Sequence, residues 1–203
     1  MQSMKDKIMV ESFKLFLEKG FESVSMSEIK KASGISVGTF YYYFKSKEDL
    51  INTVMTNYIF DYFQMALDNM NDFEGSTREE IYYVTMQIIG YDIYKKEWAN
   101  FYRKLDISDY RRIFLLYLEG VQKYELMSEK YEEYTLKVIE YTKEIVLKGQ
   151  KNNEIKDGDA LKLAKFIQST IHGTFFLWIA APEIDLINLM KENLDYLWRN
   201  IKK

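Results

Sequence analysis

The feature that most constrains this chain is the stretch of residues 25–47, which contains two helix starts and one helix stop in close succession. Ser25 and Glu28 have the S-x-x-E spacing of a capping box, in which both side chains satisfy free amides at a helix start. Gly34 can adopt the left-handed conformation that ends a helix, and Ser36 is a good N-cap for a second one. Two short helices joined by such a turn are typical of a helix-turn-helix, whose second helix enters the DNA major groove.

The second helix and the residues that follow it carry side chains suited to phosphate groups. Three consecutive tyrosines, Tyr41 to Tyr43, are followed by Lys45, Ser46 and Lys47. A hydroxyl on a rigid ring can donate a hydrogen bond to a phosphate, and a lysine can neutralise its charge. The pattern therefore favours contact with nucleic acid.

These residues, with those before them, resemble the N-terminal domain of the tetracycline-repressor (TetR) family of bacterial transcriptional regulators. The resemblance covers about the first quarter of the chain; beyond it, only the length and the all-helical layout are similar. The positions that carry it are Ile8, Met9, Leu15, Phe16, Gly20, Phe21, Ser25, Ile29, Ala32, Gly34, Ile35, Ser36, Gly38, Thr39, Phe40, Tyr41, Tyr43, Phe44, Lys47 and Leu50.

The resemblance implies roles for individual residues. Tyr41 and Lys47 correspond to phosphate contacts. Val37 stands where the family often has lysine or arginine, which favours an apolar contact with a thymine methyl group instead. For Phe40 and Phe44 we expect core packing. The complete set of predicted DNA-binding residues is Ser25, Ser27, Ser36, Val37, Gly38, Thr39, Tyr41, Tyr42, Tyr43 and Lys47.

Charge gives this interpretation little support. The net charge is −3, with 28 Lys and Arg against 31 Asp and Glu. Residues 1–50 hold eight Lys and Arg and seven Asp and Glu, a balance of 8 − 7 = +1. The sign is right for DNA at this end of the chain, but the excess is small, so the motif carries the prediction.

Composition places the chain in the soluble globular class. It has 203 residues, of which 47% are hydrophobic and 29% charged, enough to bury a sizeable core. No apolar run reaches the roughly 18 residues of a membrane span, and residues 1–7 lack the apolar region of a secretory signal. Cysteine is absent, which fits a cytoplasmic location.

The periodicity of apolar residues predicts an all-α fold with two domains. The resemblance implies that residues 1–47 form the helix-turn-helix DNA-binding domain and that residues 48–203 form a helical domain for effector binding and dimerisation. The expected helices run from about Met4 to Lys19, from Ser46 unbroken to about Met70, from a second capping box at Ser76 and Glu79, from about Ser128 to Gly149, from a cap at Asp159, and from a first turn containing Pro182.

Aromatic residues and methionines are dense in the middle of the chain, and two interpretations stay open. Aromatics at helical spacing usually form core, whereas a cavity walled by them suits a small hydrophobic or aromatic effector. The TetR resemblance favours the cavity. His172 is the only histidine, and a core or interface role outweighs an effector contact for it. The pocket candidates are Phe63, Tyr82, Met86, Tyr91, Trp98, Phe101, Phe114, Tyr117, Tyr134, His172 and Phe175.

A single helix-turn-helix reads few base pairs, so we expect a homodimer on a near-palindromic operator. The last two helices have wide apolar faces that can supply the contact, as the resemblance also implies; the alternative is that these faces bury entirely within one subunit. The interface candidates are Phe166, Phe175, Trp178, Leu194, Leu197 and Trp198.

Catalytic chemistry is not indicated. The sequence has no metal-ligand spacing, no Ser/His/Asp constellation and no glycine-rich phosphate loop, and we expect no cofactor and no enzyme activity. Our hypothesis is a DNA-binding transcriptional regulator, a repressor that a small molecule releases from a palindromic operator. The alternative is a helical small-molecule-binding or enzyme domain whose N-terminal helices serve only packing.

Overall fold

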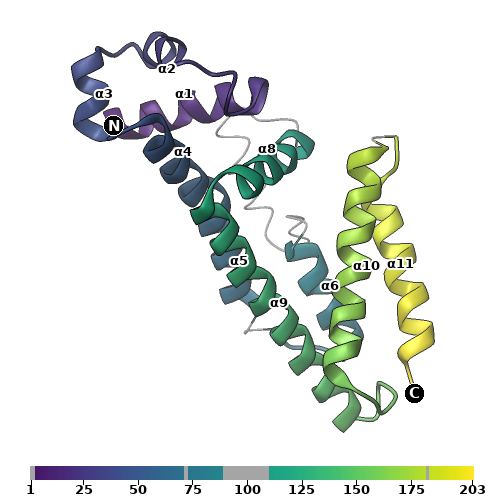
Figure 1. Ribbon diagram of the computed structural model, residues 1–203. Helices are drawn as coiled ribbons and strands as arrows, with labels where there is room; N and C mark the ends of the chain where they lie inside the picture. The colour runs from purple at the N-terminus through teal and green to yellow at the C-terminus, as the bar shows by residue number, and fades with distance from the viewer. Residues whose placement is uncertain (1–2, 71–72, 89–109, 182) are drawn as a thin grey trace. The chain divides into compact units, whose positions relative to one another are not determined.

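The computed structural model describes residues 3–70, 73–88, 110–181 and 183–203 (Figure 1). These residues form helices, which confirms the all-α class; outside the helices, Ile155 and Lys202 make one isolated antiparallel bridge. The helices are α1 (Met4–Lys19), α2 (Met26–Ser33), α3 (Val37–Tyr43), α4 (Lys47–Met55), the π-helix η1 (Thr56–Phe60), α5 (Asp61–Met70), α6 (Thr77–Ile88), α8 (Tyr110–Lys123), α9 (Glu125–Lys151), α10 (Ala160–Ala180) and α11 (Leu186–Ile201).

The chain divides into two compact units. One contains residues 1–65 and 99–132, and the other contains residues 66–98 and 133–203. Each unit therefore combines segments that are far apart in the sequence. The predicted functional boundary after residue 47 stays a prediction.

The first unit is built around the aromatic core of α1 to α4. Phe13, Phe16, Phe21, Phe40 and Phe44 are almost completely buried. Helix α1 begins after Ser3, whose side chain accepts from the Asp6 N–H, and it ends at Gly20 as predicted. Burying a phenylalanine side chain contributes about 1.5–3 kcal/mol to the free energy of folding. These five side chains therefore hold the short helices α2, α3 and α4 in one arrangement with α1.

The helix expected to run unbroken from Ser46 changes its hydrogen bonding at Thr56–Phe60, where it becomes a π-helix. There the Asp61 N–H bonds to the Thr56 carbonyl, five residues back. Tyr58, Ile59 and Phe60 are all buried, and consecutive residues of an ordinary α-helix point about 100° apart. The wider π turn is the local geometry that accompanies burial of three neighbours. Burial raises the pKa of Tyr58 to about 12.

The second unit packs α6, the later part of α9, α10 and α11 around one core. Its buried residues include Ile81, Val146, Ile167, Ile171 and Leu194. Two predicted boundaries need correction. Helix α9 begins at Glu125 rather than near residue 128. Helix α11 begins at Leu186, with a cap from the Asp185 side chain, so the expected first turn containing Pro182 is wrong; Pro182 itself lies outside the described residues.

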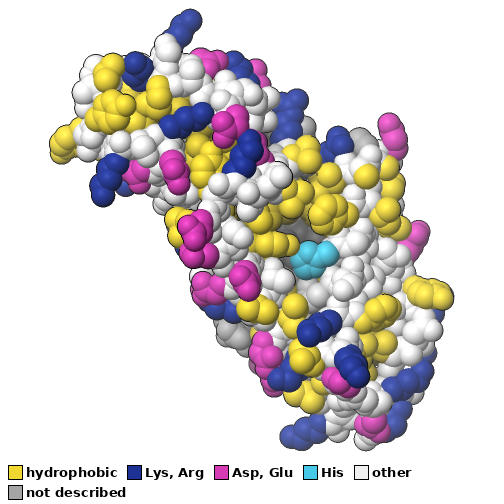
Figure 2. Space-filling view, viewed as in Figure 1, with side chains coloured by type: hydrophobic (Ala, Val, Ile, Leu, Met, Phe, Trp, Pro, Cys, Tyr) yellow, Lys and Arg dark blue, Asp and Glu magenta, His cyan; other side chains and the backbone are white. Residues whose placement is uncertain are grey.

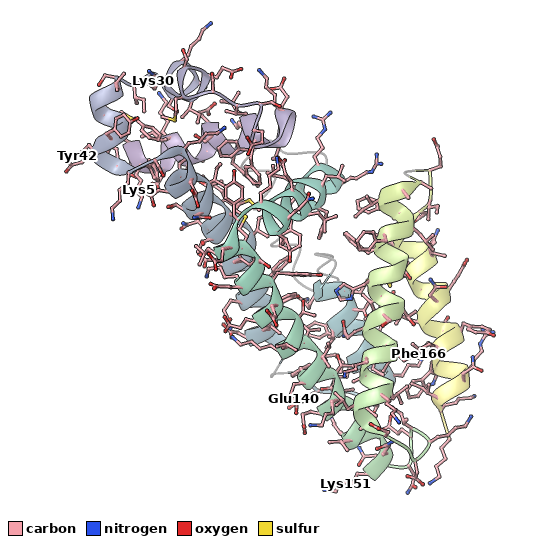
Figure 3. The ribbon with its side chains drawn as sticks, viewed as in Figure 1. Lys5, Lys30, Tyr42, Glu140, Lys151 and Phe166 are labelled. Carbon is pink, nitrogen blue, oxygen red and sulfur yellow. The ribbon has the colours of Figure 1, made fainter. Side chains whose placement is uncertain are left out.

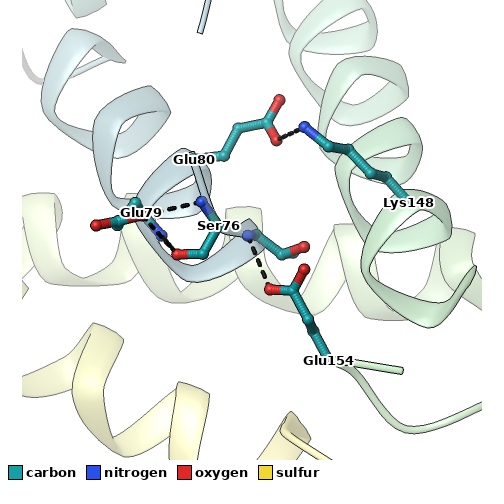
Figure 4. A network of polar contacts seen from close by, with 6 residues as sticks. Ser76, Glu79, Glu80, Lys148 and Glu154 are labelled. Carbon is teal, nitrogen blue, oxygen red and sulfur yellow. Dashed lines mark hydrogen bonds and ion pairs between the residues drawn. The ribbon is translucent and has the colours of Figure 1, made fainter. Parts of the chain in front are cut away.

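Polar contacts fix the start of α6 against the end of α9 (Figure 4). Ser76 and Glu79 form the predicted capping box, with the Ser76 N–H donating to Glu79 Oε2 at 2.9 Å. The Thr77 N–H donates to Glu154 Oε2 at 3.0 Å, and Lys148 Nζ lies 2.8 Å from Glu80 Oε2. The Glu80 side chain is largely buried, so this ion pair anchors α6 inside the unit.

Among the described helices, none combines the length and the apolar character that crossing a membrane requires.

Candidate nucleic-acid interface

The turn between α2 and α3 has the conformation that the sequence predicts. The Ser25 side chain caps α2 and accepts from the Glu28 N–H at 3.2 Å. Gly34 ends α2 in the left-handed region with φ +68°, and the Ile35 N–H bonds back to the Lys30 carbonyl at 3.0 Å. Ser36 caps α3 through the Thr39 N–H at 3.1 Å. Helix, turn and helix are therefore specified by local hydrogen bonds.

Helix α3 has one buried face and one exposed face. Phe40 lies in the core, as expected, while Val37, Tyr41 and Tyr42 are exposed. Tyr42 is the extreme case, with 82% of its surface exposed, and its side chain extends away from the other helices (Figure 3). Its ring meets that of Tyr43 edge to face at a centroid distance of 4.8 Å. The solvent-facing side of α3 therefore carries exposed tyrosine side chains.

Gly38 is not required by packing within the chain. An added Cβ atom would meet the Ser36 Oγ at 3.9 Å, an ordinary contact distance, and the backbone there needs no positive φ. A side chain could therefore be accommodated by this protein alone. A bare backbone on the exposed face of α3 suits the close approach of another molecule.

The cationic groups near α3 are few and differ in exposure. Lys45 is exposed, whereas Lys47, at the start of α4, is half-buried. The Lys45 N–H donates to the Asp49 carboxylate at 2.8 Å, and the Ser46 side chain caps α4. Figure 2 shows lysine side chains spread around α1 to α3 with acidic side chains among them. Any binding of phosphate must therefore depend on individual side-chain contacts rather than on a strong positive electrostatic potential.

A carboxylate braces α2 against the end of α1. Glu28 Oε1 lies 2.9 Å from Lys19 Nζ, and Glu28 Oε2 accepts from the Ser25 N–H at 2.8 Å. The Lys19 ammonium, followed by the Ser25 amide and hydroxyl, lowers the pKa of Glu28 to about 2. This brace adds an interhelical contact to the capping box that the sequence predicted.

Because the folded-state pKa of Glu28 lies below its usual value of 4.5, its contribution is present above pH 4.5 and is lost as the pH falls toward 2. We expect Glu28→Gln to flatten the acid side of the stability curve in this window. Thermal unfolding of both proteins between pH 6 and pH 2 measures the effect. An unchanged slope in the variant would show that another carboxylate is responsible.

Sequence reasoning missed a contact that holds the turn between α1 and α2. Glu119 of α8 accepts from the Phe21 N–H at 3.3 Å, and Lys123 bridges Glu119 and Glu22 at 3.1 and 3.7 Å. The Tyr124 ring meets Phe21 edge to face at 5.5 Å. The partners lie about a hundred positions apart, and no local pattern marks such a pair. This contact positions the helix-turn-helix from outside its own sequence.

The predicted pocket residues are distributed over both units. Phe63 and Tyr117 are buried in the first unit with ring centroids 5.6 Å apart, and Phe114 lies in the same unit. In the second unit, two candidates lie on α6, one on α9 and two on α10, and all five are buried or half-buried: Tyr82, Met86, Tyr134, His172 and Phe175. Tyr91, Trp98 and Phe101 lie outside the described residues. The pocket assignment stays a prediction.

One surface pocket of about 310 Å³ lies between α6 and α11, lined by Arg78, Glu79, Tyr82, Tyr83, Lys191 and Asp195. The Arg78 guanidinium and the Asp195 carboxylate are paired across it at 2.5 Å. In the part of the chain that the structure describes, no group of three or more His, Cys, Asp or Glu side chains is arranged to hold a metal ion.

The predicted interface residues differ in exposure. Leu194 and Leu197 are buried in the core of the second unit, and Phe175, Trp178 and Trp198 are half-buried. Phe166 is 58% exposed on α10 (Figure 3), and Phe176 and Leu177 on the same helix and Tyr196 on α11 are also exposed. Several large apolar side chains on α10 therefore face solvent in the single chain. Such a surface suits association, and the interface assignment stays a prediction.

Residues 8–54 match the family described as "Bacterial regulatory proteins, tetR family". The chain is 31% identical over 133 residues to the probable HTH-type transcriptional regulator YttP of Bacillus subtilis (strain 168), covering 64% of this chain and 60% of that protein. It spans 60% or less of the length of the first curated relatives that it matches.

Two solved structures share the fold at low identity. A putative transcriptional regulator from Saccharomonospora viridis in complex with choline is 16% identical, with a TM-score of 0.74 over 98% of this chain and 97% of that one. The regulator FadR from Bacillus subtilis in complex with stearoyl-CoA is 22% identical, with a TM-score of 0.67 over 94% and 96%. The likeness extends beyond the helix-turn-helix to nearly the whole chain.

Proposed function

We propose that this chain, whose residues 8–54 match the tetR family of bacterial regulatory proteins, is a transcriptional regulator that binds operator DNA through α3. The observation that carries the proposal is the exposed face of that helix. Val37, Tyr41 and Tyr42 project from it, and Gly38 leaves its backbone open to close approach. A short helix with these features fits the width of the major groove.

The residues on this face divide into two roles. Tyr41 and Lys47 position the domain through phosphates, because a hydroxyl and an ammonium recognise the backbone without regard to sequence. Val37, Thr39 and Tyr42 face base edges, where an apolar group selects the thymine methyl and a hydroxyl bonds to either donors or acceptors. Ser25 and Ser27, both exposed at the start of α2, add phosphate contacts.

We further propose that the active form is a homodimer. One α3 covers too few base pairs for selective binding, and two copies would read half-sites about 34–36 Å apart. The exposed apolar residues of α10 supply a surface for that association. In this proposal the protein is cytoplasmic, where it meets operator DNA. It acts as a DNA-binding protein rather than as an enzyme.

A small-molecule effector is part of the proposal. The structural relatives bind choline and stearoyl-CoA according to their descriptions, so this fold accommodates both a small cation and a long acyl chain. A ligand that binds one arrangement of the two helix-turn-helix domains more tightly than the other would shift the dimer toward that arrangement. The shift would release or retain the operator, and its size is set by the difference in ligand affinity between the two arrangements. We propose repression relieved by a hydrophobic or aromatic ligand.

The function is tested by selecting genomic DNA fragments with the purified protein and footprinting the retained ones. We expect a protected inverted repeat whose half-site centres are one helical turn apart. Retention of random fragments alone, with no protected repeat, would contradict specific operator binding. A monomer that retains no DNA would support the alternative of a small-molecule-binding domain.

Lys47→Ala gives a finer test on the operator so identified. We expect weaker binding to all sequences alike and a salt dependence of affinity reduced by about one unit, because one phosphate contact is removed. Titrations at several salt concentrations measure the slope. The matched control is Lys151→Ala at the exposed end of α9, for which the slope stays unchanged. An unchanged slope in Lys47→Ala would remove this residue from the phosphate contacts.

A further inference from the structure

Helix α10 carries a buried carboxamide that is only half satisfied. Gln168 is 4% exposed, and its Nε2 donates to Thr142 Oγ1 at 2.7 Å. Its Oε1 is buried and has no hydrogen-bond partner among the described residues. A buried amide oxygen without a donor is uncommon, because its loss of hydration is not compensated.

The neighbouring hydroxyl fixes which way this carboxamide points. Thr142 Oγ1 donates its one hydrogen to the Val138 carbonyl at 2.8 Å. Its oxygen can therefore only accept from Gln168, so the Gln168 atom that meets it must be the nitrogen. Exchanging the two ends of the carboxamide would require the Thr142 hydroxyl to give up its hydrogen bond to the Val138 carbonyl. The unpaired atom is consequently the Gln168 oxygen.

A second acceptor lies one turn further along the same face. His172 Nδ1 is 2.7 Å from the Gln168 main-chain carbonyl, which can only accept, so Nδ1 carries the proton. In the neutral imidazole the other nitrogen, Nε2, is then an acceptor. Residues four apart share a helix face, so the two acceptors project from the same side of α10. His172 is half-buried, and its ring (cyan) reaches the face seen in Figure 2.

We propose that Gln168 Oε1 and His172 Nε2 form the polar end of the effector site, and that they select a neutral ligand carrying an N–H or O–H donor. This inference rests on the proposed function as a ligand-responsive regulator. The imidazole is half-buried and the carboxamide is 4% exposed, so the ligand would meet the imidazole nearer the surface than the carboxamide. The ligand class follows from these two groups, which are both acceptors.

Other ligand classes fit this pair poorly. A carboxylate offers only acceptors and would repel both atoms. A pure hydrocarbon would leave the Gln168 oxygen unsatisfied. An ammonium ion could donate, but its loss of hydration in a buried site greatly exceeds what two neutral acceptors return. An alcohol, a phenol or a heteroaromatic N–H satisfies the site without a charge.

The test uses two probes that differ in one hydrogen-bond donor, indole and 1-methylindole, and needs no DNA. We expect wild-type protein to bind indole about 3- to 10-fold more tightly, the range expected from one neutral hydrogen bond. In Gln168→Met, which keeps the length of the side chain, this preference disappears. Calorimetric titration with each probe measures both affinities. The matched control is Gln122→Met, at an exposed glutamine of α8, which keeps the preference.

Thermal unfolding separates binding from folding. Without ligand, Gln168→Met is expected to melt at or above the wild-type temperature, since the variant removes an unsatisfied buried oxygen. Equal affinity for the two probes, or binding of neither, in the wild-type protein would overturn the inference even if the variant did not fold. A preference for indole that survives in Gln168→Met would also overturn it. Operator binding is measured separately, so failure of this site and failure of DNA binding are distinguishable.

Discussion

Phe40→Ala is expected to destabilise the first unit by about 3–5 kcal/mol and to abolish operator binding. The Phe40 side chain is fully buried, with its ring centroid 5.8 Å from that of Phe44 and 5.4 Å from that of Tyr41. Removing the ring leaves a cavity under α3, a helix too short to persist without its packing. Chemical denaturation measures the loss of stability, and a fragment containing the operator measures the loss of binding.

Tyr42→Ala on the same helix is the matched control for Phe40→Ala. This side chain is almost fully exposed, so its removal changes the free energy of unfolding by no more than about 0.5 kcal/mol. The two substitutions therefore separate folding from the proposed recognition. The first removes the packing that holds α3, and the second removes one proposed base-reading side chain from an intact helix. For Tyr42→Ala we expect a changed order of preference among operator variants, with about 1–3 kcal/mol lost at one base pair. A uniform loss across all sequences would assign Tyr42 to the phosphates instead.

The features of this structure that can be predicted from the sequence are those determined by short local segments. The capping boxes at Ser25 and Ser76, the glycine stop at Gly34 and the cap at Asp159 depend on residues within four positions of each other. Their hydrogen bonds form wherever the rest of the chain lies. Sequence reasoning therefore located the helix-turn-helix and the exposed face of α3.

The parts that sequence reasoning did not find depend on partners far along the chain. The contact between Glu119 and the Phe21 amide, and that between Glu154 and the Thr77 amide, join segments that no periodicity connects. The π-helix is a further case, since it goes with the tertiary packing of Tyr58 and not with the residues that neighbour Tyr58 in the sequence. The Phe13 ring stacks on Tyr58 at a centroid distance of 5.0 Å, a pairing visible only in three dimensions.

The same distinction applies to the candidate site on α10. His172 stands out in the sequence as the only histidine, whereas nothing in the composition marks Gln168, which is distinguished only by its unpaired oxygen in the folded chain. A buried acceptor is a property of the folded chain. The proposed ligand site is thus less accessible to sequence reasoning than the proposed DNA-reading side chains, which lie on one short helix.

Phe166→Glu is expected to convert the proposed dimer into monomers and to reduce operator affinity by more than about 100-fold. If α10 pairs across a two-fold axis, the substitution places a carboxylate on both sides of the same interface. An unpaired buried charge costs about 3–5 kcal/mol, and each 1.4 kcal/mol corresponds to a tenfold change in affinity. Analytical ultracentrifugation at micromolar and lower concentrations measures the association state.

Leu136→Glu on α9 controls for the added charge, since Leu136 is 59% exposed and Phe166 is 58% exposed. Equal exposure in the single chain means that solvation alone would make the two variants behave alike. Only an interface distinguishes them, so we expect Leu136→Glu to remain a dimer that binds operator normally. Dimers in both variants would place the association surface elsewhere, whereas monomers that still bind operator at full affinity would show that α3 alone reads enough DNA. If the two half-sites are read together, as proposed, loss of the dimer and loss of operator binding follow the same concentration dependence.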